Sequence, residues 1–226
     1  MKTPGWATLV GIAIGFLGPL LLASPASRVL GDPASVRTML FYQLAMWAFL
    51  AAVLWIVLAV ERRPLASIGL RPPGVRSIAS GLALAAVIMW VLTPLNVWLL
   101  GKLGLAGFEE GIATAGRMPP WLLAFAVLTA GVVEEVLCRG YPLERIAEWT
   151  GSAVLAGAIT VIVFALVHWP TWGAGPVLTF VISGAFVTAF YVWQRDLTAT
   201  IVAHVVVDAM GLIVVPWLSR SGSGSG

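Results

Sequence analysis

The sequence predicts an all-α fold, a polytopic transmembrane bundle of about seven helices, and three observations carry this prediction. Hydrophobic residues make up 60% of the 226 residues and charged residues only 10%, whereas a soluble domain carries about 25% charged residues. The mean hydropathy is +0.98, so the chain cannot cover a surface that faces water. The hydrophobic residues also fall into separate runs of roughly 20, the length that an α-helix needs to cross a bilayer.

The composition indicates one membrane domain over residues 1–218 and a linker-like Ser-Gly tail over residues 219–226. The net charge of +3 comes from basic residues scattered among the loops. Such a pattern reports membrane topology and gives no sign of nucleic-acid binding. The single cysteine, Cys138, excludes an internal disulfide.

The first predicted span covers residues 5–24, which are too long for a signal peptide and lack its small-residue cleavage site. The second span covers residues 38–60 and the third residues 77–100, where Pro94 predicts a kink. Between them, residues 61–76 hold four arginines, the largest positive cluster in the chain. The positive-inside rule therefore predicts that this loop and the N-terminus are cytoplasmic. The alanine-, glycine- and tryptophan-rich composition favours a bacterial plasma membrane.

After the third span, residues 101–120 are expected to form an external loop or surface helix, in which Glu109 and Glu110 are solvated. A fourth span opens at Pro119 and Pro120 and carries a second glutamate pair. The remaining spans are predicted over residues 152–169, 175–194 and 197–217.

The fourth span contains the segment Glu134-Glu135-Val-Leu-Cys138-Arg139. An ionisable residue inside a membrane span is costly and is a functional-site hypothesis by default. Glu135 and Arg139 are four residues apart, acid first, so they share a helix face and can form an ion pair. Glu134 is rotated about 100° from Glu135 and lacks that partner, which suits a group that accepts and returns a proton.

The two histidines of the chain lie in later spans, and each has a partner at helical spacing. Phe164 precedes His168 by four residues, so its ring is expected to stack on the imidazole. Asp208 follows His204 by four residues, so its carboxylate is expected to orient that imidazole and set its tautomer.

Straight helices that simply cross the bilayer would leave Glu134 and His168 at different depths. We therefore expect the fourth helix to continue through residues 143–146 into the cytosolic interface, which brings Glu134 to the depth of both histidines. The fifth helix would then stop at residues 169–170, and residues 171–175 would form a buried turn. Irregular backbone at this depth requires a protein-lined cavity, which we expect the last four helices to form and water to fill.

At this point the residues resemble a known family. Glu-Glu-x-x-x-Arg at 134–139, Phe-x-x-x-His at 164–168 and His-x-x-x-Asp at 204–208 match, in order and spacing, the three motifs of the CAAX-protease and bacteriocin-processing family (CPBP, also called Abi). This family includes the Ras-converting CAAX prenyl protease. The resemblance covers about residues 119–217, which would be the catalytic core. It implies an intramembrane endopeptidase whose substrates are membrane-associated proteins or peptides, lipidated ones among them.

The resemblance also implies a role for each motif residue. Glu134 would activate water with the help of His168, whereas His204 and Asp208 would polarise the scissile carbonyl and stabilise the oxyanion. The supporting residues would be Glu135, Arg139 and Phe164.

Two positions depart from the family pattern. Cys138 stands where an aromatic residue is common, and Asp208 stands where many members have asparagine. An aspartate accepts hydrogen bonds but donates one only when it is protonated, so the oxyanion role of Asp208 is less secure than that of His204.

Other interpretations use some of the same residues. The family is often described as metalloproteases, and Glu134, His168 and His204 could bind zinc with water in the open position. The chain has no His-Glu-x-x-His element, and Glu134 cannot easily be both ligand and base, so we favour a mechanism without a cofactor. A cysteine protease built on Cys138 is disfavoured, because a lone cysteine in a span is usually a small apolar residue. The alternatives from other classes are a non-proteolytic binding or immunity protein of the same fold and a proton-coupled transporter.

Overall fold

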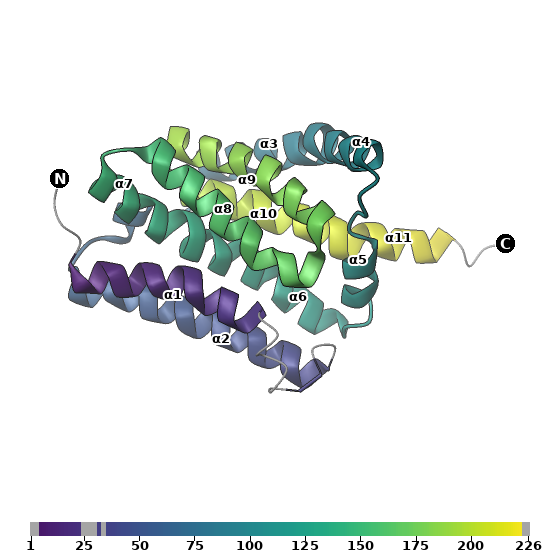
Figure 1. Cartoon of the computed structure of the whole chain (residues 1–226), viewed down its shortest axis with the longest axis horizontal. Helices are drawn as coiled ribbons and strands as arrows, with labels where there is room; N and C mark the ends of the chain where they lie inside the picture. Colours follow the sequence, from purple (N-terminus) through teal and green to yellow (C-terminus); the bar gives the residue numbers. More distant parts are fainter. Residues whose placement is uncertain (1–4, 24–30, 33–34, 223–226) are drawn as a thin grey trace.

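The computed structural model describes residues 5–23, 31–32 and 35–222, and in this part of the chain every regular element is a helix (Figure 1). The helices form seven long rods, several of which change type along their length. The rods are α1 (Trp6–Ala23); α2 (Val36–Trp55) with η2 (Ile56–Val60); α3 (Val75–Val87) with η4 (Ile88–Leu92) and α4 (Thr93–Leu103); α6 (Pro120–Thr129) with η5 (Ala130–Leu143) and α7 (Glu144–Thr150); α8 (Ala153–Trp172); α9 (Ala174–Gln194); and α10 (Leu197–Asp208) with η6 (Ala209–Val214) and α11 (Val215–Gly222). Two short helices, η3 (Leu65–Ile68) and α5 (Glu109–Ala115), lie in the connections.

Six of these rods are long and apolar enough to cross a membrane, and α1 is apolar but shorter. The six are Val36–Val60, Val75–Leu103, Pro120–Thr150, Ala153–Trp172, Ala174–Gln194 and Leu197–Leu218. The chain is thus a multi-pass integral membrane protein, and the predicted helical bundle is confirmed. α11 continues four residues into the predicted tail, to Gly222. The end of the first predicted span at residue 24, the N-terminal four residues and residues 223–226 lie outside the described residues.

The fourth rod runs without a break from Pro120 to Thr150. This confirms the prediction that the fourth helix continues through residues 143–146. Its middle segment, η5, is a π-helix over Ala130–Leu143 and carries the glutamate pair. Each N–H of a π-helix bonds to the fifth residue back, and such segments occur often at functional sites. The sequence does not predict this π-helix, because the spacing of its residues fits an ordinary α-helix equally well.

The predicted buried turn at residues 171–175 is wrong. α8 continues through Pro170 to Trp172, and α9 begins at Ala174, so the connection is Gly173 alone, and it is exposed. Proline removes only one helix hydrogen bond, and here this loss falls in the last turn of the helix. Gly173 then reverses the chain with φ +80°, a backbone conformation that glycine adopts without steric penalty.

The regular α-helix of the third rod is interrupted just before Pro94. The π-helical turn η4 ends two residues before Pro94, and the Thr93 side-chain hydroxyl donates to the Ile88 carbonyl at 3.0 Å. On the connection that follows, Glu109 and Glu110 begin α5 and are exposed, in agreement with their interpretation as solvated residues.

Glycines let α1 approach the fourth rod closely. A Cβ atom at Gly15 would lie 2.6 Å from the Leu137 carbonyl oxygen, and one at Gly11 would meet the Tyr141 ring. Small residues are what allow helix backbones to approach closely in membranes. α1 and α2 therefore lie side by side against the segment that carries the glutamates (Figure 1).

A buried polar network fixes the end of the bundle that holds the arginine-rich loop. Arg145 of α7 pairs with Glu61 at 2.7 Å and donates to the Ser67 hydroxyl at 3.1 Å. Glu61 also accepts from Tyr141 at 2.8 Å and from Thr8 at 3.1 Å. These contacts tie the first, second and fourth rods together at this end of the bundle, away from the glutamate pair.

Candidate active site

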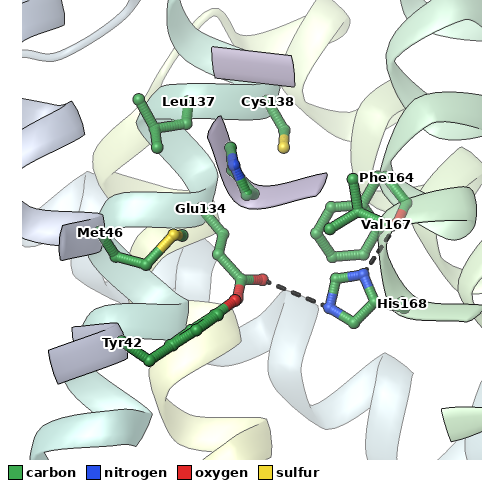
Figure 2. A pocket seen from close by; sticks show the side chains of 9 residues that line it. Tyr42, Met46, Glu134, Leu137, Cys138, Phe164, Val167 and His168 are labelled. Carbon is green, nitrogen blue, oxygen red and sulfur yellow. Dashed lines mark hydrogen bonds and ion pairs between the residues drawn. The ribbon is translucent and has the colours of Figure 1, made fainter. Parts of the chain in front are cut away.

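Glu134 of η5 and His168 of α8 face each other (Figure 2). The Glu134 Oε2 and His168 Nε2 atoms are 3.6 Å apart, and His168 Nδ1 lies 2.7 Å from the Phe164 carbonyl oxygen. A carbonyl oxygen only accepts, so Nδ1 carries a proton, and the neutral ring presents a lone pair at Nε2. These atoms are 3.6 Å apart, so a water molecule beside the pair, about 2.8 Å from each atom, can donate one hydrogen to each.

A narrow cavity lies between these two groups. It has about 10 Å³ of room for the centres of water molecules, which corresponds to roughly one water. Its walls are Pro19, Tyr42, Met46, Glu134, Leu137, Cys138, Phe164, Val167 and His168 (Figure 2).

The prediction that the last four helices form the cavity is therefore wrong in part. The fourth and fifth rods do supply Glu134 and His168, but α1 and α2 supply Pro19, Tyr42 and Met46, and the sixth and seventh rods supply none of the lining. The reason is the close packing of α1 on η5, which brings the two N-terminal rods over the glutamates.

Two aromatic rings hold the His168 imidazole. The Phe164 ring centroid lies 4.4 Å from the centroid of the imidazole, as the spacing predicts, and the Phe180 centroid lies 4.5 Å away. Phe180 comes from α9 and packs edge-on against Phe108 and Trp172. The sequence does not identify Phe180, because a single phenylalanine in an apolar helix has no distinguishing neighbour.

The second half of the site centres on Glu135. Its carboxylate forms the predicted ion pair with Arg139 and lies 2.9 Å from His204 Nδ1 through the same oxygen, Oε1. Arg139 also donates from Nε to the Thr188 hydroxyl at 3.2 Å. His204 Nε2 is 3.6 Å from Asp208 Oδ2, which is longer than a hydrogen bond. In the structure Glu135 is thus the closer partner of His204, a contact across 69 residues that no local spacing reveals.

Comparison with protein families identifies the arrangement. Residues 116–210 match the family described as type II CAAX prenyl endopeptidase Rce1-like. This part of the chain is similar to the CPBP family. It is a family of CAAX-type intramembrane proteases, and the match contains every residue of the three predicted motifs. Comparisons with curated proteins and with solved structures give no significant match.

The charged and imidazole side chains of the three motifs fall into two groups by exposure. The side chains of Glu134, His168, His204 and Asp208 are 15–26% exposed, so small molecules can reach them. Those of Glu135 and Arg139 are 1% and 5% exposed. A group that contacts substrate must be reachable, and the separation into reacting and supporting residues stays a prediction.

If the site held zinc, the predicted ligands would be Glu134, His168 and His204. Among the described residues, no three His, Cys, Asp or Glu side chains are grouped so that they could hold a metal ion. The nitrogens of His204 face Glu135 and Asp208 instead. The donor geometry does not fit zinc, and we derive no step through a metal.

Proposed function

We propose that this protein hydrolyses a peptide bond of a membrane-associated protein or peptide with water activated by Glu134. The observation that carries the proposal is that Glu134 Oε2 and His168 Nε2, 3.6 Å apart, line one cavity with room for about one water. Both atoms accept hydrogen bonds, so a water held between them is oriented by its two hydrogens, with its lone pairs left free.

The chemistry then needs only protein groups and this water. As the water oxygen forms a bond to the scissile carbonyl carbon, one of its protons passes to the Glu134 carboxylate, and the carbonyl π electrons move onto oxygen. When the resulting oxyanion collapses, the C–N bond breaks, and Glu134 returns the proton to the leaving amine. His168, held at Nδ1 by the Phe164 carbonyl, keeps the water in line with the carboxylate.

His204 supports this reaction from the other side of the glutamate pair. Its Nδ1–H donates to Glu135 at 2.9 Å. This hydrogen bond fixes the orientation of the ring and leaves Nε2 pointing away from Glu135. With protons on both nitrogens, Nε2–H can donate to the developing oxyanion, a role for which a preoriented donor in a dry site is effective. Asp208 Oδ2 stands 3.6 Å from Nε2, beyond hydrogen-bond distance, and places a carboxylate beside this N–H.

The test is cleavage of a mixed peptide library, partly lipidated at the C-terminus, by the full chain in liposomes, with products read by mass spectrometry. Wild-type protein should produce new termini that Glu134→Gln does not, because glutamine keeps the shape and removes the base. The matched control is Glu110→Gln, the same change at an exposed residue of α5, which should cleave like wild type. Cleavage by Glu134→Gln at the wild-type rate would refute the proposal, and silence of all three proteins would favour a binding or immunity role.

The same assay tests the metal-free mechanism. We expect activity to survive a strong chelator. Loss of cleavage on chelation with recovery on zinc addition, at unchanged folding, would contradict the mechanism and support the metalloprotease interpretation.

A further inference from the structure

The cavity between Glu134 and His168 is short of hydrogen-bond donors. The Glu134 carboxylate and His168 Nε2 both accept. Of the nine residues that line the cavity, Tyr42 is the one with an O–H group. The Cys138 thiol is a weak donor by comparison.

Tyr42 lies on α2, one turn before Met46, and Figure 2 shows its side chain extending toward the Glu134 carboxylate. Within the described residues the Tyr42 hydroxyl makes no direct hydrogen bond to another protein group. Tyr42 is partly buried and lines this cavity, and its hydroxyl can donate a hydrogen bond to a water there. A partner inside the cavity is therefore expected.

We propose that Tyr42 is a further catalytic residue, whose hydroxyl donates a hydrogen bond to the water held between Glu134 and His168. A water molecule offers two hydrogens and two lone pairs. The hydrogens go to Glu134 and His168, and one lone pair accepts from Tyr42. The fourth tetrahedral direction is then fixed and carries the lone pair that attacks the substrate.

This assignment rests on the proposed function, and it makes the N-terminal half of the chain part of the catalytic site. The family match begins at residue 116, so it does not reach α2. The three motifs alone orient the water through two contacts, which leave it free to rotate about the line that joins them. A third contact from Tyr42 removes this freedom, and reactivity is sensitive to such orientation.

The first test is Tyr42→Phe, which removes the hydroxyl and keeps the ring. We expect kcat for peptide cleavage to fall roughly 10- to 100-fold, with KM within about twofold, because the hydroxyl contacts water and not substrate. The matched control is Tyr141→Phe, which deletes the hydroxyl that donates to Glu61 at 2.8 Å in the polar network. It should lower the Tm and leave kcat per folded molecule unchanged. An unchanged kcat in Tyr42→Phe, with wild-type protein active, overturns the assignment and leaves the proposed function standing.

A second measurement does not depend on cleavage. The Tm is measured for Tyr42→Phe, for Glu134→Leu and for the double variant. If Tyr42 donates to a water that Glu134 holds, Tyr42→Phe alone should lower the Tm by roughly 2–4 °C. It should lower the Tm little further in the Glu134→Leu background, where the water has lost an acceptor. Equal shifts in both backgrounds, or a rise in the Tm of Tyr42→Phe, overturn the assignment even if no peptide is cleaved.

Discussion

The sharpest test of the supporting residues is Arg139→Leu. Arg139 is 5% exposed and forms an ion pair with Glu135, which is 1% exposed. The substitution removes the guanidinium from the buried Glu135 carboxylate and leaves His204, 2.9 Å away, as its remaining partner. Removing one partner of a buried ion pair lowers stability by about 3–5 kcal/mol. The lost hydrogen bond to Thr188 contributes about 1 kcal/mol within that range.

A double variant separates the fold from the function. In Glu135→Leu/Arg139→Leu both charges are gone, and replacing a whole buried pair by apolar residues is often neutral or stabilising. We expect this variant to recover more than half of the stability that Arg139→Leu loses. Its peptidase activity should still be absent, because His204 Nδ1 has lost the carboxylate 2.9 Å away that orients its ring.

The assay is equilibrium unfolding of the three proteins in one detergent, with cleavage measured per folded molecule. A destabilisation below about 1 kcal/mol for Arg139→Leu would refute the view that Arg139 neutralises Glu135. Wild-type cleavage by the double variant would refute the orienting role of Glu135.

Two further predictions concern the helix contacts and the topology. Gly15→Leu should lower stability by roughly 1–3 kcal/mol and reduce cleavage, because its Cβ would lie 2.6 Å from the Leu137 carbonyl and would push α1 off the cavity wall. Its control Gly101→Leu, at a site where a Cβ meets nothing within 4 Å, should change neither, and equal effects of the two would contradict the close packing. For the orientation, cysteines placed at the exposed positions Arg71 and Glu110 in a Cys138→Ala background should differ in labelling by an impermeant thiol reagent added to intact cells. Glu110→Cys should react and Arg71→Cys should not, and the reverse pattern would show that the N-terminus is outside.

The sequence predicts most of the fold because each span must hide its own backbone polar groups and present an apolar surface. Both requirements are met within about 20 consecutive residues, so the helices appear directly in the hydropathy. The ion pair of Glu135 with Arg139 and the stacking of Phe164 on His168 are also local, since each joins residues four apart. These two features could therefore be predicted, and the structure contains both.

Contacts between helices could not be predicted in the same way. The bond from His204 to Glu135 spans 69 residues, and Phe180 reaches His168 from the next helix. Local spacing assigned His204 to Asp208, which is four residues away but has the longer contact, 3.6 Å against 2.9 Å. Where two carboxylates compete for one imidazole, packing decides which is closer, and packing depends on residues far away in the sequence.

The residues that line the cavity could not be predicted from local spacing either. Some of them lie outside the three motifs, in the first two rods. All three motifs lie within residues 116–210, which invites the conclusion that the first helices only anchor the chain. Yet α1 approaches η5 through Gly11 and Gly15, and with α2 it closes the space in which Glu134 meets His168. A carboxylate and an imidazole exposed to lipid on that side would have neither a held water nor a partner for their polar atoms. The N-terminal helices therefore enclose this space, as the proposed water-dependent chemistry requires inside a bilayer.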